Sequence, residues 1–142
     1  MDADLKKHVI KTGTTTIGII CKDGVVVAAD KRGSYGGESG VSYIAGTNQE
    51  KIQTVLPNVI VTTAGTASDT RKTIKLVRAE LKLKELKSKK KAKISEIANL
   101  FSNISYQSIR QPSMIPSIAH FVLAGYDPKG FSLREWGSWN DQ

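Results

Sequence analysis

The order of the expected elements predicts an α+β fold with its helices grouped on one face of a sheet. Several β-rich segments come first, two amphipathic helices follow in direct succession, and β-rich segments return before residue 142. Two adjacent helices between groups of strands do not fit alternating βαβ units, in which single helices separate parallel strands. The 142 residues are enough for one domain with its own core.

The first half of the chain is expected to consist of strands. Residues 14–21 and 25–30 are β-rich and flank Asp23-Gly24, a strong signal for a tight hairpin turn. Residues 31–50 are rich in Gly, Ser and Tyr and are expected to form a long loop or an irregular strand. A short strand at 52–55, a turn at 56–58 and a buried strand at 59–64 that ends at Gly65 complete this half.

Two helices and a further pair of strands are expected in the second half. Ser68 or Asp69 can cap a helix that runs to about Lys87, and Pro112 and Pro116 end a second helix at 94–110. The first helix carries two apolar stripes: Ile74, Val77 and Leu81, and Leu76, Ala79, Leu83 and Leu86. They predict one face for a sheet and one for a neighbouring helix or subunit. Strands are expected at 118–125 and 131–134, around a turn at 127–130.

Composition argues against several classes of protein. No apolar run approaches the roughly 18 to 20 residues of a membrane-spanning helix, and residues 1–13 lack the apolar stretch of a secretory signal. We therefore expect a cytoplasmic protein without a membrane partner. Cys21 is the only cysteine and is expected to be a small core residue. One cysteine and two histidines do not suggest a zinc site, and no metal or other cofactor is expected.

The formal charge of +8 is concentrated in one segment. Seven lysines lie between Lys82 and Lys93 and are opposed only by Glu85. Such a run attracts phosphates without specificity, so one hypothesis is a non-catalytic protein that binds an acidic surface, RNA or DNA. The run has no interleaved aromatic residues on which bases could stack, which argues against nucleic acid. A solvated loop between helices is the favoured interpretation.

The Gly13-Thr14 junction carries the main chemical hypothesis. If the bond after Gly13 were cut, Thr14 would have a free α-amine beside its own hydroxyl, and one residue would supply both nucleophile and base. An α-amine titrates near pKa ~8, so part of it is neutral at cellular pH. The simpler interpretation is that a threonine-rich strand start only reflects β-propensity.

Several motifs, in order, resemble the β-type subunits of proteasomes, and the archaeal-type subunits above all. They are GTTTIG at 13–18, KDGVV at 22–26, AADKR at 28–32, KI at 51–52, TAG at 63–65 with Asp69, LFSN at 100–103 and GYD at 125–127. The resemblance implies an N-terminal nucleophile hydrolase with an αββα sandwich. This chain would supply its first strands, first helix pair and part of the second sheet. Residues 1–13 would be a propeptide and 14–142 the N-terminal portion of the β-type domain.

The resemblance also implies roles for single residues. Thr14 would be the nucleophile, released by autocatalytic cleavage after Gly13, and Asp30 and Lys51 would lie beside it. A lysine ammonium there would lower the pKa of the α-amine, because it disfavours a second positive charge. Gly65 would donate a backbone N–H to the oxyanion hole. The substrate-binding positions of the family match Ser34 and Ala67, for backbone hydrogen bonds, and Gly33 and Thr63, near the pocket for the residue before the scissile bond.

The implied protein is a threonine endopeptidase subunit of a proteasome core particle. It would degrade unfolded polypeptide within stacked rings of α-type and other β-type subunits. In the family, a later serine and aspartate complete the threonine site, and neither has a counterpart before Gln142, so we expect the chain to be C-terminally incomplete. Two alternatives stay open: a truncated or inactive subunit with a structural role, and a related acyl-transfer enzyme (a peptide ligase). Trp136 and Trp139 match no role in the family.

Overall fold

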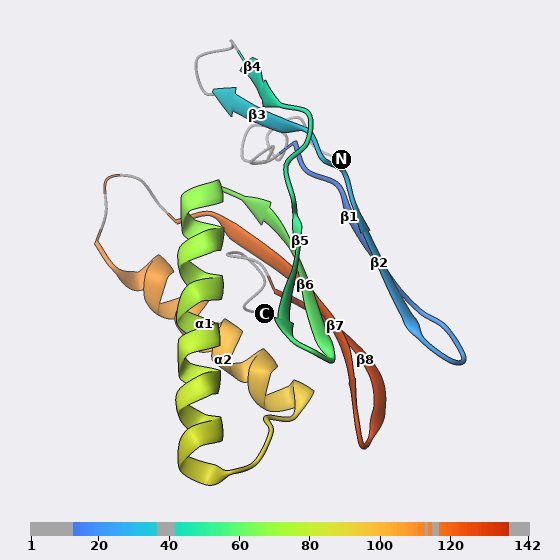
Figure 1. The fold of residues 1–142 in the computed structure, drawn as a ribbon. Helices are drawn as coiled ribbons and strands as arrows, with labels where there is room; N and C mark the ends of the chain where they lie inside the picture. The colour runs from blue at the N-terminus through green and yellow to red at the C-terminus, as the bar shows by residue number, and fades with distance from the viewer. Residues whose placement is uncertain (1–12, 37–41, 113, 115–116, 137–142) are drawn as a thin grey trace, which may run out of the picture.

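The computed structural model describes residues 13–36, 42–112, 114 and 117–136, and it confirms an α+β fold (Figure 1). Its strands are β1 (Thr16–Ile20), β2 (Val25–Ala29), β3 (Gly33–Gly36), β4 (Ser42–Gly46), β5 (Ile52–Leu56), β6 (Val59–Gly65), β7 (Ala119–Asp127) and β8 (Gly130–Trp136). Its helices are α1 (Ala67–Ser88) and α2 (Ile94–Arg110). The expected propeptide up to residue 12, Pro116 and Trp139 lie outside the described residues.

The structure has three layers. Strands β5, β6, β7 and β8 form an antiparallel sheet in sequence order, and α1 and α2 cover one of its faces (Figure 1). The β1–β2 hairpin covers the opposite face, where Gly18 approaches the side chains of Val122 and Leu133. A Cβ on Gly18 would lie 2.6 Å from a Leu133 methyl carbon, so the absence of a side chain permits this close packing.

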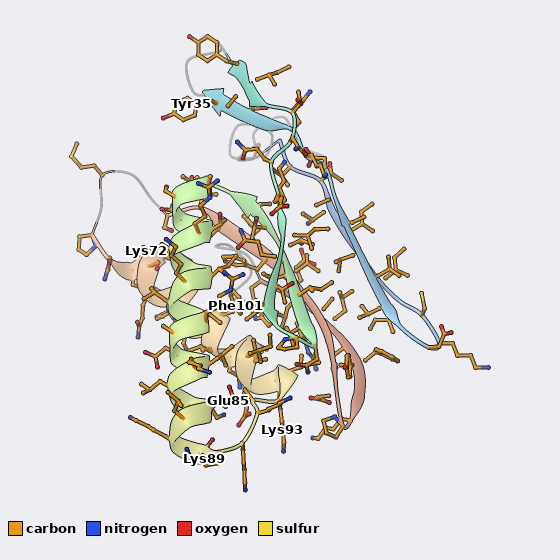
Figure 2. The ribbon with its side chains drawn as sticks, in the orientation of Figure 1. Tyr35, Lys72, Glu85, Lys89, Lys93 and Phe101 are labelled. Carbon is orange, nitrogen blue, oxygen red and sulfur yellow. The ribbon has the colours of Figure 1, made fainter. Side chains whose placement is uncertain are left out.

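The core lies between the helices and the four-stranded sheet. Phe101 of α2 is completely buried and packs against Phe121, with ring centroids 5.1 Å apart (Figure 2). Trp136 stacks on the Phe101 ring, with ring centroids 6.5 Å apart. The sequence did not indicate this packing role. Ile74, Val77 and Leu81 of α1 are buried against the sheet, which confirms the first apolar stripe.

The β1–β2 hairpin and helix α1 each expose apolar side chains. The outer face of the β1–β2 hairpin includes Ile17, Ile19 and Val26, each more than half exposed. The second stripe of α1 is exposed at Leu76, Leu83 and Leu86. These positions match the expectation that the second stripe of the helix does not face the sheet.

Three expectations about local structure were wrong. Residues 31–50 contain an antiparallel hairpin, β3–β4, with an irregularity between Gly33 and Ser34, instead of one loop or strand. Helix α1 begins at Ala67 after Thr66, so neither Ser68 nor Asp69 is its cap. Cys21 is exposed, because it lies in the β1–β2 turn and not in the core.

The packing of Phe101 leads to a stability prediction. Phe101→Ala should lower the free energy of unfolding by about 3–5 kcal/mol, because it removes a ring from a closed core and leaves a cavity. Ile19→Thr is a matched control, because it keeps a β-branched side chain at a site that is 55% exposed; its cost should stay within about 0.5 kcal/mol. Urea unfolding followed by circular dichroism measures both, and similar costs would contradict the assigned layers.

Candidate active site

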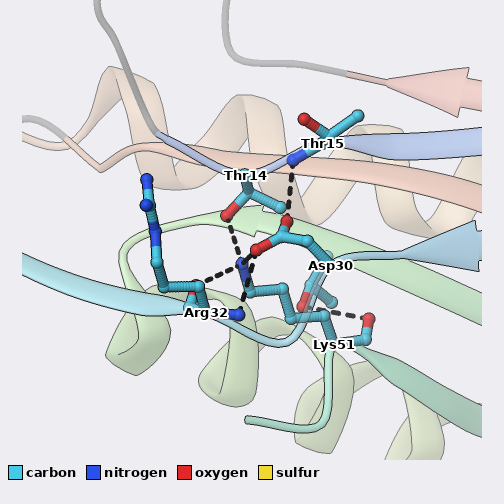
Figure 3. Close-up of polar contacts among 6 residues, drawn as sticks. Thr14, Thr15, Asp30, Arg32 and Lys51 are labelled. Atoms are coloured by element: carbon cyan, nitrogen blue, oxygen red, sulfur yellow. Dashed lines mark hydrogen bonds and ion pairs between the residues drawn. The ribbon is translucent and has the colours of Figure 1, made fainter. Parts of the chain in front are cut away.

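Lys51 joins three chain segments at the end of the β1–β2 hairpin (Figure 3). Its Nζ donates hydrogen bonds to Thr14 Oγ1 at 2.9 Å, to Asp30 Oδ2 at 2.9 Å and to the Arg32 carbonyl oxygen at 2.7 Å. An ammonium group has three protons, so these acceptors use all of its donors. The Lys51 side chain is only 10% exposed, which places a fully hydrogen-bonded cation beside the threonine hydroxyl.

The local fold explains why these residues meet. Thr14 lies two residues before β1, Asp30 directly follows β2, and Lys51 directly precedes β5. Because β1 and β2 are antiparallel and Thr16 pairs with Ala29, the start of β1 lies beside the end of β2. Gly13 is exposed next to Thr14, with φ 68°.

Both oxygens of Asp30 accept hydrogen bonds. Oδ1 accepts from the Thr15 N–H at 2.9 Å, and Oδ2 accepts from the Arg32 N–H at 3.0 Å as well as from Lys51. The hydrogen bond from Lys51, followed by that from Thr15, holds the pKa of Asp30 below its ordinary value. A carboxylate with a lowered pKa is a weak base, so this geometry suits Asp30 to hold Lys51 and the Thr14–Thr15 backbone in place.

The Thr14 hydroxyl is positioned but still needs a base. Lys51 donates to Oγ1, and the hydroxyl proton is therefore free to leave in another direction. The ammonium would stabilise negative charge on Oγ1, yet a charged lysine cannot also accept the proton. Asp30 is occupied by three donors. The contacts of the described residues thus provide stabilisation for the oxygen without a strong proton acceptor.

Gly65 is the last residue of β6 and lies two residues before α1. The Thr63 N–H donates to the Lys51 carbonyl at 2.8 Å, and alternate N–H groups of a strand point to the same edge, so the Gly65 N–H is directed to this edge of β6, two residues beyond Thr63. The β5–β6 register ends at Ile52 and Thr62, so no residue of β5 pairs with Gly65. Its φ is 112°, and a Cβ there would overlap the Ile118 carbonyl oxygen, which favours glycine at this position.

The structure brings most of the expected site residues to one hollow. Its lining includes Thr14, Lys51, Thr63, Gly65 and Ala67. Gly33 and Ser34 are not among its lining residues. A Cβ on Gly33 would contact the side chain of Gln49, and Ser34 is exposed on β3 opposite Ile44.

Sequence reasoning missed several polar residues that line the hollow. They are Gln49, Glu50, Gln53, Thr70 and Arg71. For two of them, the spacing from an expected site residue could have predicted a position on the same face of the strand or helix. Gln53 follows Lys51 by two residues, and Arg71 follows Ala67 by four, one turn along α1.

The lysine-rich segment lies at the far end of the helix pair, where Lys89 and Lys93 are seen in Figure 2. Lys84 Nζ forms an ion pair with Glu96 Oε1 at 2.6 Å, and the Lys93 N–H donates to Glu96 Oε2 at 2.8 Å. The hydrogen bond from Lys84, with that from Lys93, lowers the pKa of Glu96. Part of the run therefore stabilises the start of α2.

The described part of the chain contains neither a metal-binding cluster nor a membrane-spanning helix. Residues 13–36, 42–112, 114 and 117–136 contain no group of three or more His, Cys, Asp or Glu side chains arranged to hold a metal ion. Within those same ranges, no helix is long and apolar enough to cross a membrane.

Comparison with known proteins gave one consistent family. A family model described as "Proteasome subunit" matches residues 10–135. "Proteasome subunit beta" of Archaeoglobus profundus is 36% identical over 121 residues, which are 85% of this chain and 52% of the relative. "Proteasome subunit beta 2" of Pyrococcus abyssi is 35% identical over 117 residues, 82% of this chain and 52% of the relative. "Proteasome subunit beta 2" of Aeropyrum pernix is 33% identical over 136 residues, 94% of this chain and 58% of the relative. The chain spans about half the length of the curated relatives it matches.

The lowered pKa of Asp30 leads to a pH-dependent prediction. Asp30→Asn should lower the free energy of unfolding at neutral pH, because Lys51 loses its charged partner. The folded-state pKa is below the ordinary value of 3.8, so the carboxylate stabilises the fold above that pH, and this contribution is lost as pH falls through the folded-state pKa. The difference between wild type and variant in urea unfolding should therefore shrink below about pH 4.

Asp23→Asn is the matched control for this measurement. It removes one negative charge from the β1–β2 turn, away from Lys51, and Asn suits a turn position as Asp does. A difference between wild type and Asp30→Asn that stays constant from pH 7 to pH 2 would contradict the stabilising ion pair.

Proposed function

The chain belongs to the proteasome subunit family, and from this premise we propose that it is a threonine-type endopeptidase subunit of a proteasome core particle. Thr14 is the proposed nucleophile and unfolded polypeptide the proposed substrate. The observation that carries the proposal is the 2.9 Å contact between Lys51 Nζ and Thr14 Oγ1, supported by Asp30 behind the lysine.

The base is proposed to be the α-amine of Thr14 itself. Lys51 contacts the threonine oxygen and Asp30 is a weak base, so neither is suited to accept the hydroxyl proton. An α-amine has a pKa near ~8, is partly neutral at cellular pH, and would be attached to the same residue as the hydroxyl. Removal of residues 1–13 would create this amine.

The same hydroxyl is proposed to perform that removal. Thr14 Oγ1 loses its proton and adds to the Gly13 carbonyl carbon, the Gly13–Thr14 amide bond breaks, and the nitrogen takes up one proton to become the amine, so the net transfer is of the hydroxyl proton to the nitrogen. The resulting ester between Gly13 and Thr14 is hydrolysed by water, which releases residues 1–13. Substrate cleavage follows the same order: acyl transfer to Oγ1, departure of the new amino terminus, and hydrolysis of the acyl-threonine.

Gly65 is proposed to stabilise the tetrahedral intermediate. Negative charge develops on the carbonyl oxygen during attack, and a preorganised N–H can stabilise it. Gly65 and Thr14 line the same hollow, and the β5–β6 register ends before Gly65, so its N–H is available for this role in the proposal. Loss of one such donor typically costs ~3 kcal/mol of transition-state stabilisation.

Assembly with α-type and other β-type subunits is part of the proposal. Family membership supports it, and so do the exposed apolar side chains on the outer face of β1–β2 and on α1, since clustered exposed apolar side chains are typical of contact sites.

The proposal predicts self-removal of residues 1–13. When the full chain is co-expressed with α-type proteasome subunits, wild type should lose these residues, and Thr14→Ala should keep the full mass. Thr15→Ala is the matched control: it removes the neighbouring hydroxyl, while its N–H can still donate to Asp30, so it should be processed like wild type. Intact-mass spectrometry measures all three.

Two results would refute Thr14 as the nucleophile: full mass retained by wild type, or cleavage after Gly13 in Thr14→Ala at the wild-type rate.

A peptide substrate with an added amine separates hydrolysis from acyl transfer. Hydrolysis predicts free carboxylic acid products, and new amide products would favour the acyl-transfer alternative.

A further inference from the structure

The strand-to-helix junction at Gly65 is held by a residue from a distant part of the chain. The Thr66 N–H donates to the Ile118 carbonyl oxygen at 2.9 Å, and the same oxygen lies against Gly65. The position of the Ile118 peptide therefore sets the path of the backbone at Gly65. Ile118 directly precedes β7, so its own N–H is outside the β6–β7 register, which begins with Gly65 and Ala119.

Asp69 accepts the Ile118 N–H, which the β6–β7 register leaves unpaired. Its Oδ2 accepts the Ile118 N–H at 3.3 Å, although the two residues are 49 positions apart. The peptide groups on both sides of Ile118 are thus held from the β6–α1 junction: Thr66 binds its carbonyl, and Asp69 binds its N–H. Asp69 is half-buried in the first turn of α1 and is not among the residues that line the hollow at Thr14.

We propose that Asp69 is a positioning residue for the reaction at Thr14, acting through Ile118 on the Gly65 N–H. This inference rests on the proposed function. An oxyanion donor is effective only when it is fixed before charge develops, and a shift of about 1 Å can cost up to ~10²-fold in rate. Loss of the Asp69 hydrogen bond releases Ile118, and the Gly65 N–H then loses the backbone contact that fixes it.

A purely structural role for Asp69 makes a different prediction. A carboxylate in the first turn also stabilises a helix through the helix dipole. Asp69→Asn removes the charge but keeps an oxygen that can accept the Ile118 N–H. The double variant Ser68→Asp/Asp69→Ala keeps a carboxylate in the first turn of α1, at an exposed position, but removes the acceptor of the Ile118 N–H. The two variants therefore separate the helix charge from the hydrogen bond to Ile118.

The test uses the full chain co-assembled with α-type proteasome subunits and a peptide carrying a C-terminal fluorogenic amide. Asp69→Ala should lower kcat by about 10-fold and leave KM within about 2-fold, because an oxyanion donor acts in the transition state. Asp69→Asn should keep kcat within about 3-fold of wild type, and the double variant should be as slow as Asp69→Ala. Thermal unfolding of each assembly is measured in parallel.

The outcomes separate this inference from the proposed function. Wild type that cleaves no faster than Thr14→Ala overturns the proposed function, and the inference with it. An active wild type with an equally active Asp69→Ala overturns the inference alone. Recovery of kcat in the double variant also overturns it, since the helix charge would then be the relevant property. If Asp69→Ala does not fold, the comparison of Asp69→Asn with the double variant decides.

Discussion

The site depends on one buried cation and its three acceptors. Lys51 is bound to oxygens of Thr14, Asp30 and Arg32, which flank the β1–β2 hairpin, while Lys51 directly precedes β5 of the four-stranded sheet. A cation that is 10% exposed loses much of its hydration, so each lost acceptor would leave a costly unpaired donor. The geometry at Thr14 is therefore coupled to the docking of the β1–β2 hairpin on the four-stranded sheet.

That docking includes a close approach of the hairpin backbone to the sheet at Gly18. Gly18 lets the hairpin lie against Leu133, and its larger apolar neighbours, Ile17 and Ile19, point away from the sheet. Gly65 allows a similar approach to Ile118. Side chains at either glycine would displace the backbone that carries the reacting groups, so the two positions constrain the site without touching Thr14.

The sequence predicted the parts of this arrangement that have local signals or a family motif. Asp23-Gly24 placed the first turn, helical spacing placed α1 and α2, and the motifs identified Thr14, Asp30 and Lys51, which the structure brings into contact. The β3–β4 hairpin was missed, because Gly-rich strands with an irregular register show no clear alternation. The local pattern offers Ser68 or Asp69 as a possible helix cap, because both side chains can accept an N–H. Asp69 instead accepts the N–H of Ile118, which is 49 residues away and outside any local pattern.

The contacts at Thr14 separate two requirements of a threonine nucleophile. Oxygen stabilisation is present in the uncut chain, since Lys51 already contacts Oγ1 while residue 13 is attached. Proton acceptance is not provided by the same contacts, because Asp30 holds three donors and has a lowered pKa. A reaction that needs both would be slow before the Gly13–Thr14 bond breaks and faster afterwards, because the bond that breaks supplies the amine. In the proposed mechanism, removal of residues 1–13 therefore precedes substrate cleavage, because the amine that accepts the proton forms only when the Gly13–Thr14 bond breaks.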